Sequence, residues 1–163
     1  MKKLFSSLSL ILMLAGCSTQ DVALQEERLD AGDFTILAPE DWTFTPLVGT
    51  DSTVGQFSNG EMTLSFDYGM HTGDFSRDSV YFEDPSAYTV VEETINGLEA
   101  KIYVPNEASS EKPTVLFIAH PKGVGPCTED ICALEENFQM LGDNLTEVQV
   151  DTALEIFRTV DFS

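Results

Sequence analysis

The chain has 163 residues, which is enough for one domain with an ordinary hydrophobic core. It contains 28 Asp and Glu residues against 8 Lys and Arg residues, a formal net charge of -20 at pH 7. A surface of this sign repels phosphate backbones, so the composition argues against nucleic acid as a partner. A well-solvated surface that resists aggregation accounts for the acidity more simply than a specific cation site does.

The N-terminal segment contains the only long apolar run of the chain, residues 4–15, which follows the positively charged Lys2 and Lys3. As a helix this run would be about 18 Å long, whereas the hydrocarbon core of a bilayer is about 30 Å thick. The run also stands at the extreme N-terminus and precedes a polar tract, which argues against a buried core helix. This arrangement is typical of an export signal.

The end of the apolar run, LAGC at residues 14–17, resembles the lipobox of bacterial lipoproteins, and the resemblance covers residues 1–17. It implies that residues 1–16 are a signal peptide that is removed. Cys17 then becomes the mature N-terminus and carries fatty chains such as palmitate, one of them on its thiol. Several acyl chains anchor a protein stably to a membrane without spanning it.

This resemblance has consequences for charge and location. Loss of Lys2 and Lys3 leaves 6 Lys and Arg against the same 28 acids, a mature net charge of -22. Among bacterial lipoproteins, Ser18 in place of an Asp after the acylated cysteine implies sorting to the outer membrane. The expected location is therefore the bacterial cell envelope, anchored to the outer membrane through Cys17, with the choice between a periplasmic and an external face left open.

The three cysteines are an odd number, and assigning Cys17 to lipid leaves the pair Cys127 and Cys132. In an oxidising compartment two cysteines this close in sequence indicate a local disulfide. So short a loop contributes at most about 2 kcal/mol on the chain-entropy model. Two separate free thiols are one alternative. Zinc is another, because His120 and His71 would complete a set of suitable ligand atoms, although the CxxxxC spacing is wider than the usual CxxC.

The mature chain divides into a tether and one domain. Residues 17–32 are polar and acidic, and we interpret them as an acylated tether with weak helical potential at residues 21–28. No internal repeat or low-complexity block follows. The boundary is placed near Asp33, so that residues 33–163 form a single globular domain.

Alternation between apolar and polar residues predicts antiparallel strands in the first two thirds of this domain. The clearest case is 61–68, where alternate residues from Met62 to Tyr68 share one face. The Asn-Gly pairs at 59–60 and 96–97 are typical of tight hairpin turns. The predicted strands are 33–37, 42–47, 54–58, 61–68, 88–95 and 98–104.

The last third predicts one more buried strand and a helix. Residues 114–119 (TVLFIA) are apolar on both faces, which indicates a central strand covered on both sides. Thr146 and Gln149 fit a capping box, and apolar residues recur after them at helical spacing. A last strand is predicted at 158–162, and the segment 120–139 is ambiguous between loop and strand. The predicted fold class is α+β, a mainly antiparallel sheet with two Asn-Gly hairpins, packed by a C-terminal helix.

Two short segments resemble a known family of small domains. Residues 36–42 (ILAPEDW) and 153–162 (ALEIFRTVDF) look like the opening and the ending of domains related to the photosystem oxygen-evolving protein PsbP and the nuclear transport factor Mog1. The resemblance implies an antiparallel sheet flanked by helices, and a role in assembly or binding. This chain departs from the pattern because it has few predicted helices between its strands. Residues 48–69 also look like uncharacterised bacterial lipoproteins and exported proteins, from which no role transfers.

Motifs of catalysis are scarce. The sequence contains neither GxSxG nor SxxK, and its two histidines, His71 and His120, make a chance Ser-His pairing unpersuasive. The loop at residues 68–74, which includes His71, is a speculative ligand-binding or catalytic spot, and a surface loop with an exposed histidine explains it more simply.

The sequence thus favours a membrane-anchored binding or assembly-accessory domain with an envelope protein as its partner, and it predicts no catalytic residue, cofactor or metal. Two alternatives stay open. One is an envelope hydrolase that uses the loop of His71 or His120, and the other is a metal-binding domain that uses Cys127 and Cys132.

Overall fold

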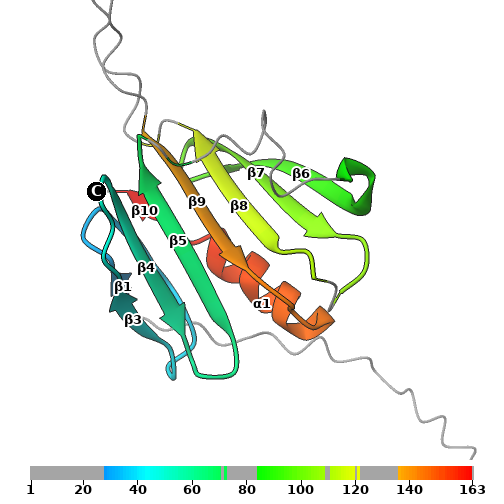
Figure 1. Cartoon of the computed structure of the whole chain (residues 1–163), viewed down its shortest axis with the longest axis horizontal. Coiled ribbons are helices and arrows are strands. Elements are labelled where there is room, and N and C mark those ends of the chain that lie inside the picture. Colours follow the sequence, from blue (N-terminus) through cyan, green and yellow to red (C-terminus); the bar gives the residue numbers. More distant parts are fainter. Residues whose placement is uncertain are drawn as a thin grey trace, which may run out of the picture.

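The computed structural model describes residues 28–70, 72, 84–108, 111–119, 121 and 136–162. In this part, a seven-stranded antiparallel sheet forms one layer, and helix α1 packs with a small three-stranded sheet against one of its faces (Figure 1). The strand order is β3-β4-β5-β9-β8-β7-β6 in the large sheet and β1-β2-β10 in the small one. The predicted α+β class is therefore confirmed. The elements are β1 (Leu29–Asp30), β2 (Phe34–Ile36), β3 (Thr43–Pro46), β4 (Ser52–Ser58), β5 (Thr63–Gly69), the 3-10 helix η1 (Pro85–Ala87), β6 (Tyr88–Ile95), β7 (Leu98–Pro105), β8 (Thr114–Ala119), β9 (Asn137–Gly142), α1 (Glu147–Phe157) and β10 (Asp161–Phe162).

The β6–β7 hairpin has the predicted two-residue turn. Ile95 pairs with Leu98, and the intervening Asn96 and Gly97 have φ angles of 48° and 87°. A type I′ turn requires positive φ at both central residues, which Asn and Gly tolerate best. The Asn96 side chain also donates a 2.6 Å hydrogen bond to the carbonyl of Val160, so the turn is tied to the C-terminal segment.

The β4–β5 hairpin is confirmed, but its turn is longer than the Asn-Gly pair predicts. Ser58 pairs with Thr63, which leaves a four-residue connection. Within it, the side-chain oxygen of Asn59 accepts hydrogen bonds from the amides of Glu61 and Met62, at 3.1 and 2.9 Å. These side-chain bonds to the backbone stabilise a wider loop, which explains why the shorter turn does not form.

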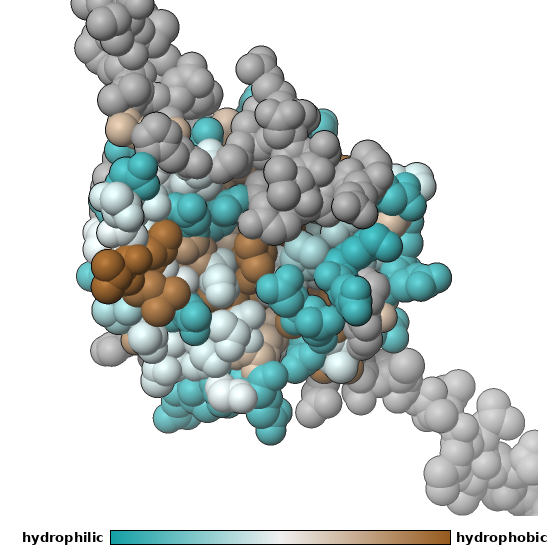
Figure 2. All heavy atoms as spheres, viewed as in Figure 1, coloured by the Kyte–Doolittle hydropathy of each residue, from teal (hydrophilic) through white to brown (hydrophobic). Residues whose placement is uncertain are grey.

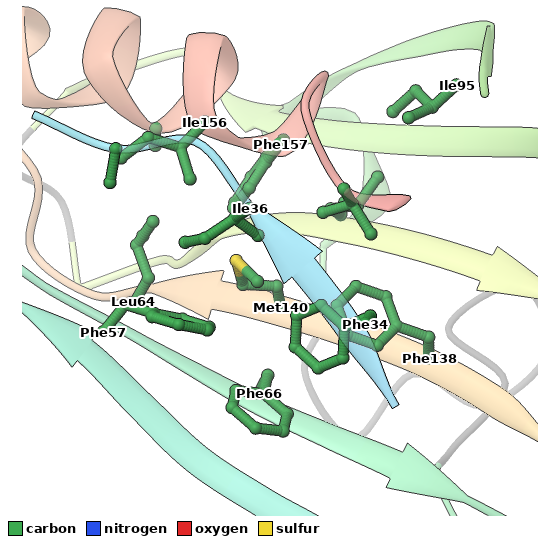
Figure 3. Close-up of a cluster of buried hydrophobic side chains, with 14 of the residues drawn as sticks. Phe34, Ile36, Phe57, Leu64, Phe66, Ile95, Phe138, Met140, Ile156 and Phe157 are labelled. Atoms are coloured by element: carbon green, nitrogen blue, oxygen red, sulfur yellow. The ribbon is translucent and has the colours of Figure 1, made fainter. Parts of the chain in front are cut away.

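The main core lies between the large sheet, α1 and the small sheet. Figure 3 shows Phe34 and Ile36 of β2 between α1 and side chains of β5 and β9. The ring of Phe34 is fully buried, and its centroid lies 4.8 Å from those of both Phe66 and Phe138, in edge-to-face geometry. This geometry is the favoured arrangement of aromatic rings, so β2 is held to the sheet largely by ring packing.

The opposite face of the large sheet, here called the outer face, carries a second and smaller cluster. It joins Tyr88 and Tyr103 to Val115 and Phe117 of β8, and all four side chains are buried. The alternate β8 residues belong to the main core. Strand β8 is therefore a central strand buried on both faces, as its unbroken apolar sequence predicts.

Helix α1 begins where the capping box predicts. The Thr146 hydroxyl accepts a bond from the Gln149 amide, and the Gln149 side-chain oxygen accepts one from the Thr146 amide at 2.9 Å. The helix buries Val150, Ala153 and the residues Ile156 and Phe157 against the core. The capping box therefore reduces the number of unpaired amides in the first turn. The apolar stripe determines which face of the helix packs against the core.

Three elements differ from the sequence prediction. Strand β9 begins at Asn137, in the last three residues of the ambiguous stretch 120–139, and extends to Gly142 between β5 and β8. Most of the remaining stretch lies outside the described residues. Strand β1 lies within the segment assigned to the tether, because Leu29 and Asp30 pair with β2. The final strand β10 contains only two residues, since Arg158 and Thr159 form a turn after the helix.

Candidate functional site

All five residues singled out from the sequence lie outside the described residues: Cys17, His71, His120, Cys127 and Cys132. The structure therefore reports neither their contacts nor whether any of them meet. The described residues beside the two histidines are nonetheless informative. Gly69 at the end of β5 and Ala119 at the end of β8 both pair with Asn137, so the chain leaves the sheet at the same end before each histidine.

Polar contacts stabilise this end of the sheet. The buried hydroxyl of Thr72 donates a 3.0 Å hydrogen bond to Asp67. The phenol of Tyr68 donates a 2.7 Å bond to the Glu136 carboxylate, and burial and the nearby charges of Glu136 and Asp33 raise the pKa of Tyr68 well above its usual range. The phenol therefore stays protonated at neutral pH, where it acts as a hydrogen-bond donor and not as a base.

A cavity, here called the β6–β8 pocket, opens next to this end of the sheet. It has a volume of about 460 Å³, within the range of small-ligand pockets. Strands β6, β7 and β8 supply its walls, chiefly from their outer faces. Its lining consists of Glu92, Glu93, Thr94, Glu99, Ala100, Lys101, Phe117 and Ala119.

The electrostatics of the pocket are dominated by carboxylates. Glu92 and Lys101 are direct cross-strand neighbours, and their side chains form an ion pair of 3.6 Å. Glu93 points to the other face, where it accepts bonds from Nε of Arg158 at 3.2 and 3.3 Å. Glu99 has no ion pair with any described residue. The outer wall of the pocket thus presents Glu99, which no described cation pairs, beside a weakly held, solvent-exposed ion pair.

The apolar part of the lining complements these charges. Phe117 is almost fully buried and contributes an aromatic surface, while Ala119 is small and exposed. Carboxylates beside an aromatic ring can hold an ammonium or guanidinium group and its hydrocarbon stem together. The arrangement suits a cationic, amphipathic ligand group rather than an anion.

Sequence analysis did not identify the pocket residues. The Asn-Gly hairpin places Glu92 opposite Lys101 and Thr94 opposite Glu99, so this half could have been derived from the predicted turn and register. Phe117 lies next to Lys101 only because β8 pairs with β7, and that pairing has no local signal in the sequence.

The surface shows two further features. Leu47 and Val48 are exposed apolar residues on the loop between β3 and β4, and Figure 2 shows apolar side chains gathered on that side of the molecule, with hydrophilic ones predominating where β6 and β7 lie. Among the described residues, no three His, Cys, Asp or Glu side chains are grouped closely enough to hold a metal ion. The described part also contains no helix with the length and apolar character needed to cross a membrane.

Comparison with known proteins gives one match. A family model described as the prokaryotic membrane lipoprotein lipid attachment site matches residues 1–18. No curated protein and no solved structure matches the chain, so the resemblance to PsbP and Mog1 receives no support. The match supports the predicted lipobox, and with it a bacterial lipoprotein that is lipid-anchored to a membrane of the cell envelope.

Proposed function

We propose that this chain is a lipid-anchored, non-enzymatic binding domain of the bacterial envelope that engages a cationic group of an envelope partner at the β6–β8 pocket. The observation that carries the proposal is the pocket itself, whose lining on one face of the sheet includes Glu92, Glu99 and Phe117. The hydrolase and metal-binding alternatives depend on residues outside the described part, and no observation favours either.

The position of the domain relative to the membrane supports this role. Eleven residue steps separate the lipid-bearing Cys17 from Arg28, where the described structure begins. At 3.3 to 3.6 Å per residue they reach at most about 40 Å. The pocket is therefore confined to a layer next to the membrane, where a partner that is also held in the envelope meets it at high effective concentration.

Site-specific photo-crosslinking in living cells tests the proposal. A photoreactive residue at Thr94, in the pocket wall, should give one discrete crosslinked product of higher mass. The matched control is Val148 on α1, which is exposed like Thr94. It should give none. Glu99→Gln combined with the Thr94 probe should weaken the crosslink. Absence of any product at Thr94, or identical products at both positions, would contradict the proposal.

We also propose that the anchor lies in the outer membrane, on the basis of Ser18. Membrane fractions separated by density should contain the chain with the outer membrane. Ser18→Asp should move it to the inner membrane, whereas Ser18→Ala should leave it in place. Recovery of the unaltered chain with the inner membrane would refute this part of the proposal without affecting the pocket.

A further inference from the structure

Strand β6 is one edge of the seven-stranded sheet. It spans eight residues and pairs with β7 on one side, and no described strand pairs with its other side (Figure 1). An edge strand of this kind exposes backbone N–H and C=O groups that can accept a further strand.

The register of the hairpin shows which groups are available. In a two-residue hairpin the pair next to the turn, here Ile95 and Leu98, is hydrogen-bonded, and bonded pairs then alternate with non-bonded ones. Val90, Glu92 and Thr94 therefore direct their backbone groups away from β7. No backbone hydrogen bond joins these three residues to any other described element.

The opposite edge of the sheet is protected, whereas no described residue protects the free side of β6. Strand β3 has four residues and ends at Pro46, which has no N–H to donate. By contrast, β6 contains neither proline nor lysine, and its pairing with β7 is continuous from Tyr88 to Ile95 without a bulge. It is also rich in β-branched residues, and the side chains of Val90 and Val91 are 47% and 36% exposed.

Contacts on the core side of the sheet also hold β6 in place. Arg158 donates to Glu93, and the Asn96 side chain donates to the Val160 carbonyl, so two contacts join β6 and its turn to the segment that follows α1. A strand that is already ordered loses little conformational entropy when another strand adds to it. These contacts therefore favour strand addition over a rearrangement of the edge.

Charge decides which occupant suits this edge. A second copy of the chain carries the same strongly negative charge, and antiparallel pairing of two β6 strands would bring Glu92 and Glu93 of both copies together. Like charges opposite one another destabilise strand pairing. A strand that carries lysine or arginine would instead place its cations beside Glu92 and Glu99, where the β6–β8 pocket opens next to the edge.

From these observations we infer that β6 accepts an extended segment of a partner protein as an added strand, and that this segment carries Lys or Arg on the outer face and apolar residues on the opposite face, beside Val91. Backbone bonds to Val90, Glu92 and Thr94 would supply affinity, and the pocket would select the cationic side chain. This inference rests on the proposed binding function and names its partner class and mode.

Peptide binding to the purified, lipidated chain in detergent tests the inference. The probe is a ten-residue peptide of alternating Lys and Val. One control peptide has Glu in place of Lys, and a second keeps the Lys-Val sequence but is N-methylated at every second residue, which removes the amides that would bond to β6. We expect the probe to bind at least tenfold more tightly than either control peptide. Amide exchange should slow at Val90, Glu92 and Thr94.

Variants of β6 separate backbone pairing from charge attraction. Val90→Pro removes an outward N–H without removing a β6–β7 hydrogen bond. It should weaken binding of the Lys-Val peptide at least tenfold. Val90→Thr keeps that N–H and should change binding less than threefold. If Val90→Pro fails to fold, the N-methylated peptide still decides the question.

Two results would overturn the inference: equal binding of the N-methylated and unmodified Lys-Val peptides, or a dimer of the chain that Val90→Pro abolishes. If the two Lys-Val peptides bind equally but Glu99→Gln weakens both, only strand addition is rejected. The proposed pocket function then stays intact. If the probe peptide binds no better than its controls and the Thr94 crosslink is also absent, both strand addition and the proposed pocket function are rejected.

Discussion

Gly55 of β4 shows how one missing side chain permits ring packing. A Cβ atom at this position would lie 2.7 Å from ring atoms of both Phe44 and Phe66. These rings stack at a centroid distance of 6.1 Å, and Phe66 also packs against Phe34, so it has little room to move. The glycine therefore serves the packing of the core, although glycine is unfavourable in a strand.

We predict that Gly55→Ala lowers the free energy of unfolding by about 1 to 3 kcal/mol, because overpacking costs more than the gain of up to about 1 kcal/mol from replacing a glycine in a strand. Urea denaturation measures the change. The neighbouring Gln56→Ala is the control and should stay within about 0.5 kcal/mol. A Gly55→Ala protein as stable as the unaltered chain would show that the rings adjust freely.

The phenol of Tyr68 links stability to alkaline pH. Its pKa in the folded chain is raised by burial and by Glu136, whereas an unfolded tyrosine has a pKa of about 10. Above pH 10 the unfolded chain loses this proton and the folded chain keeps it, so the contribution is present below pH 10 and declines as the pH rises. Burial raises the pKa of Tyr88 as well, which adds to the decline.

Tyr68→Phe should therefore lose about 1 kcal/mol of stability at pH 7, where its bond to Glu136 is missing. Between pH 9 and 11.5 its stability should fall less steeply than that of the unaltered chain. Tyr88→Phe should also reduce the slope, and the double variant should reduce it most. Parallel curves for Tyr68→Phe and the unaltered chain in chemical denaturation would contradict the assignment.

At the scale of elements, the capping box is the feature that starts α1 at its observed residue. Its two reciprocal bonds satisfy amides that the first helical turn otherwise leaves unpaired. Helix α1 has eleven residues, and a helix this short is marginal by itself, so it depends on both its cap and its packing against the sheet.

Thr146→Ala should lower the free energy of unfolding by about 1 kcal/mol, the usual cost of losing a threonine cap. Thr152→Ala is the matched control in the middle of the same helix, where alanine has the higher helix propensity, and it should cost nothing. Thermal and urea denaturation of both variants measure the difference. Equal losses in the two variants would show that the cap contributes no more than an ordinary helical position.

The two hairpins show how much of a turn the Asn-Gly dipeptide predicts. The same Asn-Gly dipeptide forms a two-residue turn between β6 and β7, but lies within a four-residue connection between β4 and β5. The difference arises because Asn59 bonds to two amides of its own loop, whereas Asn96 bonds to the distant carbonyl of Val160. A dipeptide indicates a hairpin, and tertiary contacts select the turn length.

At the scale of the whole molecule, the three cysteines are assigned two roles. Lipidation would occupy Cys17, and the disulfide between Cys127 and Cys132 stays a prediction, because both residues lie outside the described part. The exported location implied by the lipid attachment site places the pair in a compartment where disulfides persist.

Thiol titration of the purified, unfolded chain checks this assignment. Without a reductant we expect no reactive thiol, and after reduction we expect the two thiols of Cys127 and Cys132. A variant in which both are replaced by serine should show none in either condition. Two reactive thiols before reduction would exclude the disulfide, and additional reactivity from Cys17 would show that its sulfur is not acylated.

The sequence by itself determined what depends on neighbouring residues. The lipid attachment site, the alternation of β5, the β6–β7 turn and the capped start of α1 follow from spacings of a few residues, and each is found as predicted. These features need only local sterics, hydrogen bonding and hydrophobic patterning, which act before the chain is folded.

Only the tertiary structure decided how distant segments meet. Strand β9 lies between β5 and β8, where it is largely buried, so its sequence shows no clean alternation to reveal it. The same pairing order leaves β6 at an edge and brings Phe117 into one pocket lining with Glu92 and Glu99. Such contacts depend on the free energy of the whole packed core, and no short stretch of sequence contains that information.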